Sequence, residues 1–123
     1  MRNELNFNYN WNNKLSGTFF TTLRMKDDNR FRIGETHTIL LNKKPIFTAD
    51  IVAIRSFLLK DINEFVAGLD TGYNAEECRK MIRTMYKNQN IDWDKRYMSL
   101  ILFRKNKTSV DSFKQSHSEQ ASA

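Results

Sequence analysis

The chain has little of what builds cross-links and metal sites. Its 123 residues include one cysteine, Cys78, and two histidines, His37 and His117. A lone cysteine excludes a disulfide within the chain and a zinc site made of several thiolates. Neither histidine has a cysteine or carboxylate at the spacing of metal ligands, so we expect no metal ion and no other cofactor.

Long apolar runs and familiar enzyme signatures are also missing. No stretch approaches the roughly 20 apolar residues that span a membrane, and the first residues lack the pattern of a signal peptide. The sequence contains no P-loop, no glycine fingerprint for dinucleotides and no Ser-His-Asp constellation. We therefore expect a cytoplasmic protein with no membrane partner.

Positive charge is what the sequence does have. The net charge is +6 at pH 7, which favours anionic partners such as nucleic acid. Hydrophobic residues make up 40% of the chain, enough for a packed core in a single domain over residues 1–105. Residues 106–123 are polar with balanced charges, and we expect them to form a disordered tail. The excess positive charge therefore belongs to the folded part.

The chain is organised around residues 15–24, where Gly17 leads into β-branched and aromatic residues that end at Arg24. This pattern predicts a strand entered through a tight turn. Side chains alternate across a strand, so one face carries Thr18, Phe20, Thr22 and Arg24. We expect this face to form the polar floor of a pocket. We expect the opposite face to point into a core, with Phe19, Thr21 and Leu23.

Further strands are predicted over residues 36–41, 46–57 and 97–104. The last residue of the turn before the second of these is the only proline, Pro45. In the N-terminal segment, apolar residues alternate with polar ones, which predicts a half-buried strand or an extended arm; they are Leu5, Phe7, Tyr9 and Trp11.

Two helices are expected between the strands at residues 46–57 and 97–104. In the first, Asp61 is the candidate cap, and the apolar stripe consists of Ile62, Phe65, Val66 and Leu69. In the second, Asn74 is the cap with Glu77 three residues on, and the stripe consists of Cys78, Met81, Ile82 and Met85. Strands, two helices and a returning strand predict an α+β fold. We expect a small curved sheet or β-barrel of about five to six strands with two main helices packed on it.

The motif Gly17-x-Phe19-x-x-Thr22-x-Arg24, followed by Phe31-x-Ile33-Gly34-Glu35, resembles the ASCH domains of the PUA-like superfamily. Over roughly residues 5–105 the order of elements also agrees. The resemblance implies a PUA-like β-barrel with a cleft beside the motif and a ligand such as RNA or a nucleotide. On this basis Gly17, Thr22 and Arg24 are expected to bind the ligand.

One bacterial subfamily, the N(4)-acetylcytidine amidohydrolases, is similar in having threonine at the sixth motif position. There a lysine, the threonine and a glutamate are thought to carry the hydrolysis. Thr22 matches, but the lysine position holds Phe19, and the glutamate position falls near Asp70. A threonine hydroxyl needs a neighbouring base to become a nucleophile, and phenylalanine has none. Lys14 or Lys26 could reach the cleft, but no spacing requires it, so we expect binding rather than catalysis.

Several signals have two interpretations. Thr22 and Arg24 would grip a base or phosphate, or make ordinary cross-strand contacts. The segment with Asp70, Gly72 and Tyr73 would cover the cleft, Tyr73 stacking on a base, or would only connect two helices. Trp11 and Trp93 are stacking platforms or core residues.

A basic face is predicted on the second helix, with Arg79, Lys80, Arg83 and Lys87. It would follow the phosphates of a nucleic acid or would only be solvated. Cys78 lies on the apolar stripe and is expected to be buried.

Three functions follow from the sequence. The leading hypothesis is a binding module for RNA or a nucleotide-like ligand. The first alternative is a small amidohydrolase acting on a modified nucleoside, with Thr22 as nucleophile and Asp70 as acid or base. The second alternative is a protein-interaction module that retains the fold.

Overall fold

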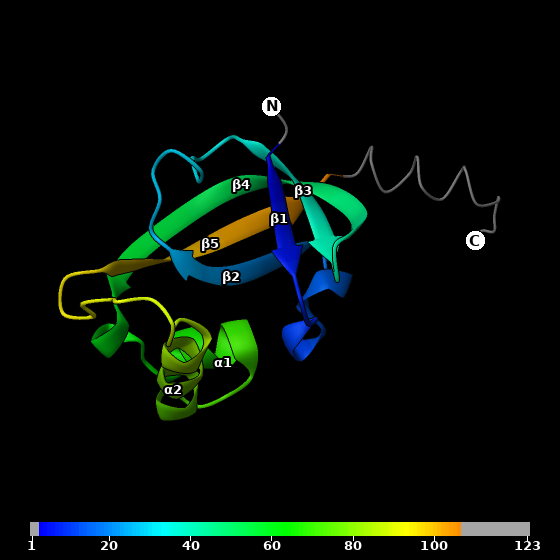
Figure 1. The fold of residues 1–123 in the computed structure, drawn as a ribbon. Coiled ribbons are helices and arrows are strands. Elements are labelled where there is room, and N and C mark those ends of the chain that lie inside the picture. Colours follow the sequence, from blue (N-terminus) through cyan, green and yellow to red (C-terminus); the bar gives the residue numbers. More distant parts are fainter. Residues whose placement is uncertain (1–2, 107–123) are drawn as a thin grey trace, which may run out of the picture.

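The computed structural model describes residues 3–106, and most of the predicted tail lies outside them (Figure 1). The side chain of Trp11 is also outside the described part, so neither interpretation of it is tested. The described residues form five strands and two α-helices, which confirms the α+β class. The strands are β1 (Glu4–Phe7), β2 (Phe19–Met25), β3 (Thr36–Leu41), β4 (Lys44–Leu58) and β5 (Tyr97–Lys105). The helices are α1 (Glu64–Thr71) and α2 (Ala75–Met85), and short 3-10 helices cover Trp11–Ser16 and Leu59–Asp61.

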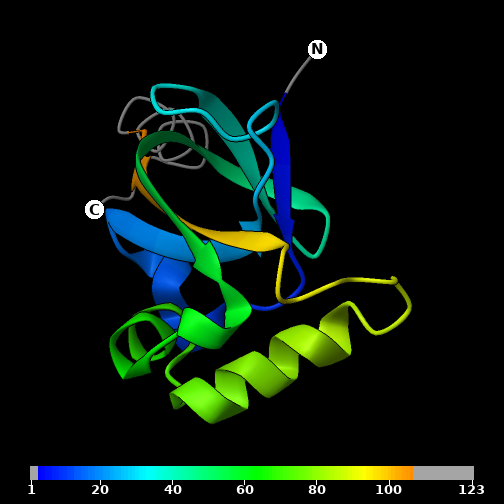
Figure 2. The same ribbon diagram turned by 90° about the vertical axis from the view of Figure 1, so that its left-hand side faces the viewer.

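All five strands belong to one mixed sheet in the order β1-β3-β4-β5-β2. Only the β1–β3 pair is parallel; the other pairs are antiparallel. The sheet curves into a half-barrel, and both helices lie together at one end of it (Figure 1). Figure 2 shows the segment after α2 running out beyond the helix before it returns to β5. The expectation of a small curved sheet carrying two helices is confirmed at this level.

The outer edge of β1 is bound by two arginines instead of another strand. The carbonyl oxygens of Asn3 and Phe7 accept bonds from backbone amides of residues 38 and 42 on the β3 side. The carbonyl oxygen of Asn6 accepts a bond from Nη2 of Arg24, and that of Glu4 accepts one from Nη2 of Arg30, each at 3.0 Å. These guanidinium groups satisfy backbone acceptors that a bare strand edge would leave to water.

The inner surface of the half-barrel is filled by aromatic rings. Phe20 stacks on Phe103 at 5.2 Å and meets Phe47 edge-on at 5.7 Å. This corrects part of the expectation for β2: Phe20, expected on the floor of a pocket, lies in the core, and Phe19, on the other face, is 54% exposed. Leu23 packs against a buried cluster beside the helices, as expected for its face. The reason is curvature: the concave face of the sheet carries Phe20, and the convex face meets the helices or solvent.

His37 belongs to the same core and is fully buried. Its Nε2 lies 3.1 Å from the carbonyl oxygen of Arg30, which can only accept, so Nε2 carries the proton of that bond. Burial lowers the pKa of His37, which keeps the ring neutral at neutral pH. The histidine thereby positions the loop that carries Arg30.

Regular alternation of buried and outward side chains along β4 holds only for its first half. Phe47, Ala49 and Ile51 are buried, but the register shifts between Ile51 and Ala53. A β-bulge at this point moves later side chains to the other face, so Ile54, and not Ala53, packs on the core. Beyond the bulge, Phe57 packs against the helices.

Helix α1 differs from the prediction in its cap and in its buried face. Asn63, not Asp61, is the cap, since its Oδ1 accepts a bond from the Val66 amide at 2.9 Å while Asp61 ends a 3-10 helix. Phe65 is 73% exposed and Leu69 51% exposed, so half of the expected stripe faces outward. The buried face instead consists of Ala67, Asp70 and Thr71.

Helix α2 follows the prediction more closely. The capping box between Asn74 and Glu77 is present in both directions. Cys78 and Ile82 are buried in a second cluster between the helices and the sheet, as predicted, whereas Met85 is 63% exposed. Trp93 packs against this cluster and contacts Tyr86 edge-on at 6.1 Å, which supports the core interpretation of Trp93.

Candidate functional site

A cavity of about 250 Å³ lies between β1, β2 and the two helices. We call it the inner pocket. Its polar side chains come from β1 and the segment after it, from the first 3-10 helix, from β2 and from the end of α1: Asn6, Asn8, Tyr9, Lys14, Thr22, Arg24, Asp70 and Thr71. Its apolar walls come mainly from Phe7, Met81, Ile82, Met85 and Met98, with Tyr86 beside them. The structure thus brings together Thr22, Arg24 and Asp70, three residues singled out in the sequence.

A buried ion pair forms one side of the inner pocket. Nζ of Lys14 lies 2.6 Å from Oδ1 of Asp70, and each side chain is only 6% exposed. The same carboxylate oxygen accepts a bond from Oγ1 of Thr21 at 2.9 Å, and Nζ of Lys14 donates to the Thr21 carbonyl at 2.8 Å. These bonds explain why α1 buries its Asp70 face: they hold its last turn against β2.

Two opposing effects act on the pKa of the Lys14 amine. Burial lowers the pKa of the Lys14 amine, and the carboxylate of Asp70 opposes this effect without reversing it. The amine therefore releases its proton more easily than an exposed lysine does. The sequence left the position of Lys14 open; the 3-10 helix over Trp11–Ser16 is what directs it toward α1.

Thr22 and Arg24 form the opposite side. Thr22 is 3% exposed, and its Oγ1 accepts a bond from Nε of Arg24 at 3.1 Å. The Arg24 guanidinium lies 4.9 Å from the centre of the Phe7 ring and binds the Asn6 carbonyl. Burial lowers the pKa of Arg24, but a guanidinium remains charged in proteins. Arg24 is therefore a fixed positive charge in the wall of the pocket.

Two of the predicted ligand-binding residues lie outside the lining of this pocket. Gly17 is exposed and precedes β2, and a side chain there would approach the Phe19 carbonyl oxygen to 3.3 Å. Tyr73 is 42% exposed and follows Gly72, whose positive φ of 80° ends α1. Asp70 and Thr71 are thus in the last turn of the helix, not in the loop that was expected.

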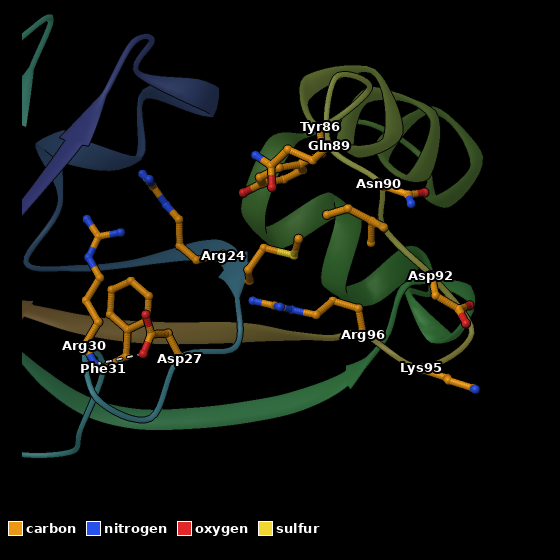
Figure 3. A pocket seen from close by; sticks show the side chains of 12 residues that line it. Arg24, Asp27, Arg30, Phe31, Tyr86, Gln89, Asn90, Asp92, Lys95 and Arg96 are labelled. Carbon is orange, nitrogen blue, oxygen red and sulfur yellow. Dashed lines mark hydrogen bonds between the residues drawn. The ribbon is translucent and has the colours of Figure 1, made fainter.

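A second, wider cavity of about 620 Å³ adjoins the first (Figure 3). We call it the outer groove. It lies between the loop after β2 and the segment that joins α2 to β5, and Arg24 and Tyr86 line both cavities. Its charged residues are Arg24, Arg30, Lys95 and Arg96, with Asp27 and Asp92. Figure 3 shows Arg96 extending toward the strand that carries Arg24, while Lys95 points outward at the rim.

Sequence reasoning found Arg24 but missed the other three groove cations, Arg30, Lys95 and Arg96. They sit in loops with no periodic pattern, and only the fold brings the two loops together. The predicted basic face of α2 lines neither cavity: Lys80, Arg83 and Lys87 are exposed, and Nη1 of Arg79 donates to the Ile62 carbonyl at 2.5 Å. Its role in binding nucleic acid stays a prediction.

Within residues 3–106, no group of three or more histidine, cysteine or acidic side chains is arranged to hold a metal ion. No helix in the same range is both long and apolar enough to cross a membrane.

Comparison with known proteins identifies the fold but not the activity. No family model matches the chain, and no curated protein does. A crystal structure of protein EF3133 from Enterococcus faecalis V583, assigned to the family DUF984, is similar with a TM-score of 0.60. The two chains are 12% identical, and the match covers 88% of this chain and 74% of that one. At this identity the likeness shows the fold alone, so the ASCH resemblance is not confirmed.

Proposed function

We propose that this protein binds RNA by taking one unpaired nucleotide into the inner pocket. The observation that carries the proposal is the pairing of apolar walls with a few fixed polar groups in one small cavity. Binding sites for small organic groups have this composition, since apolar walls bury the faces of a ring while the polar groups orient its edge. A nucleobase presents both: two apolar faces and an edge of donors and acceptors.

The polar groups fit such an edge. Asp70 offers carboxylate acceptors, while Lys14 and Arg24 offer donors, and hydrogen bonds to Thr21, Thr22 and Asn6 already fix all three side chains. Fixed groups lose little conformational entropy when a ligand binds. The three charges sum to +1, which favours an anionic ligand over a neutral one.

The size of the pocket limits what can enter. Its volume of about 250 Å³ is slightly below the roughly 300 Å³ at which pockets for drug-sized ligands begin. One base with part of its sugar is a ligand of this scale, and a base within a duplex would have to leave its stack to enter. RNA is favoured over other sources of a base by the resemblance to ASCH domains of the PUA-like superfamily.

Met85→Glu tests this proposal. Met85 lines the pocket and is 63% exposed, so a glutamate there keeps its hydration and leaves the fold intact, while it repels an anion at the entrance. We expect at least about a tenfold loss of affinity for a labelled single-stranded RNA hexamer of mixed sequence, measured by fluorescence anisotropy. Thr84→Glu is the matched control, because it adds the same charge to the same helix outside the pocket. Equal affinities of the two variants would refute the proposal.

A second candidate function, amidohydrolysis of an acylated nucleoside, is favoured by the position of Lys14. The sequence motif lacks its lysine, but Lys14 places an amine in the same pocket as Thr22. Burial lowers the pKa of Lys14, and its neutral amine would accept the Thr22 hydroxyl proton through one bridging water, since the two groups lie on opposite sides of the pocket. The Thr22 oxygen would then attack the acyl carbon. The amide bond breaks, the proton passes to the leaving amine, and water releases the acyl group as a carboxylic acid.

This second function predicts acetate release from N(4)-acetylcytidine. Thr22→Val removes the nucleophile while nearly preserving its shape, and it should abolish turnover; Thr84→Val on the exposed face of α2 should not change it. Turnover should rise with pH, because the neutral Lys14 amine is the active form and becomes more abundant as the pH approaches its pKa. Wild-type protein that releases no acetate would eliminate this candidate.

A further inference from the structure

The outer groove carries more positive charge than its own carboxylates neutralise. Four cationic residues face two acidic ones in its lining. None of these four cations lies within ion-pair distance of a carboxylate among residues 3–106, where the ion pairs are Lys14–Asp70, Lys26–Asp28 and Arg32–Glu35. The groove therefore holds positive charge that is free to meet an anion from outside.

Both carboxylates of the groove are occupied by backbone amides. Oδ1 of Asp27 accepts bonds from the amides of Asn29 and Arg30 at 3.1 and 3.3 Å. Oδ1 of Asp92 accepts one from the amide of Asp94 at 3.1 Å. These local turns use the carboxylates to shape the two loops, so they compete less with an incoming ligand for the arginines.

The arginines are held in place by neutral carbonyl groups. Arg24 and Arg30 donate to the carbonyls of Asn6 and Glu4, and Arg96 lies 3.5 Å from that of Lys26. Each guanidinium has five N–H donors, so these bonds leave others available. A planar guanidinium that is already oriented suits the paired oxygens of a phosphate.

The two cavities meet at Arg24 and Tyr86, which line both. A nucleotide whose base enters the inner pocket would place its sugar and phosphate at this junction. We infer that the outer groove binds consecutive backbone phosphates of the single strand whose base lies in the inner pocket. The inference rests on the proposed function and extends it from one nucleotide to a strand.

A free nucleoside triphosphate presents the same phosphate chemistry at the same junction. The groove favours a strand of nucleic acid, because its cations are distributed over β2 and two loops and its volume of about 620 Å³ is more than twice that of the pocket. A chain of phosphates separated by sugars spans such a site, whereas a triphosphate is compact.

The test uses the double variant Lys95→Gln/Arg96→Gln and its matched control Lys80→Gln/Arg83→Gln. Both remove two positive charges, one pair from the groove and the other from the exposed face of α2. Binding of labelled RNA hexamer is measured by anisotropy at several salt concentrations, with a nucleoside monophosphate, a triphosphate and an RNA trinucleotide as competitors. We expect affinity to increase from monophosphate to trinucleotide to hexamer, and the triphosphate to compete more weakly than the trinucleotide.

The groove variant should bind the hexamer about tenfold more weakly at low salt. Its plot of log affinity against log salt should be shallower, with a slope less negative by about 1.4, because each phosphate of a single strand that is no longer neutralised reduces the magnitude of the slope by about 0.7. The control should keep the wild-type affinity and slope. Equal losses of affinity in both double variants would overturn the inference, because net charge alone would explain binding.

Two other results separate this inference from the proposed function. If Met85→Glu abolishes binding but the groove variant binds like wild type, the result supports nucleotide binding in the inner pocket and refutes phosphate binding in the outer groove. If the triphosphate competes as well as the hexamer does, the groove serves a free nucleotide and the strand is refuted. Absence of any RNA binding at low salt would overturn both proposals.

Discussion

Replacing Lys14 with methionine should lower the free energy of unfolding by about 3–5 kcal/mol, the usual loss when one partner of a buried ion pair is removed. The variant keeps the length and much of the packing of the side chain but leaves Asp70 as a carboxylate that is 6% exposed with no cation beside it. The Thr21 hydroxyl remains as a donor to this carboxylate, but one neutral hydrogen bond does not replace an ammonium group.

Urea denaturation of three variants checks this expectation. Lys26→Met is the matched control, because its partner Asp28 is 80% exposed and such surface pairs contribute only about 0.2–1 kcal/mol. The double variant Lys14→Met/Asp70→Leu should recover most of the stability, since it also removes the uncompensated charge. A destabilisation of the same size in Lys14→Met and Lys26→Met would contradict the role assigned to the buried pair.

Replacing Arg24 with alanine should cost about 2–4 kcal/mol, because each hydrogen bond to a charged group contributes about 1.5–3 kcal/mol and the two here share one side chain. In one of these bonds Nη2 of Arg24 donates to the Asn6 carbonyl at the edge of β1. In the other, Nε of Arg24 donates to the Thr22 hydroxyl oxygen. The variant also removes the guanidinium from the face of the Phe7 ring.

Thermal unfolding should separate this effect from that of an ordinary surface arginine. Arg55→Ala serves as the control, since Arg55 is exposed on β4, and it should change stability by less than about 0.5 kcal/mol. Arg24→Lys should fall between wild type and Arg24→Ala, because a lysine keeps the charge but lacks the planar fork that reaches both acceptors. If Arg24→Ala were as stable as Arg55→Ala, the β1 edge would not depend on this residue.

A loss of RNA binding in Arg24→Ala would reflect the fold as well as the site, so Met85→Glu is the better variant for testing RNA binding.

Much of the fold was predictable because the signals are local. The alternating run at 36–41 is β3 with the predicted bounds, and the cap formed by Asn74 with Glu77 begins α2. Each depends on neighbours within a few residues, which the sequence displays directly. The same holds for Cys78, whose place on an apolar stripe predicted its burial.

The features that sequence reasoning missed depend on tertiary contacts. The bulge after Ile51 is set by pairing with β5, and no residue type within β4 predicts it. Helix α1 buries Asp70 instead of Phe65 because the carboxylate meets a lysine 56 positions earlier in the chain. The motif showed Thr22 and Arg24, but the partners that complete the site are Lys14 and the loop residues Arg30 and Arg96. These three have no fixed spacing from the motif, so only the folded chain brings them to it.

The position of the ligand can be measured directly through the methionines. Met81, Met85 and Met98 line the inner pocket, whereas Met25 lines the outer groove. Titration of protein labelled with ¹³C at the methionine methyl groups with nucleoside monophosphates therefore reports on each cavity separately. We expect saturable shifts of the Met81, Met85 and Met98 signals. The dissociation constant from these shifts should equal the one found when a nucleoside monophosphate competes with the labelled RNA hexamer. Shifts of Met25 alone, or binding that leaves all four signals in place, would contradict a nucleotide-binding inner pocket.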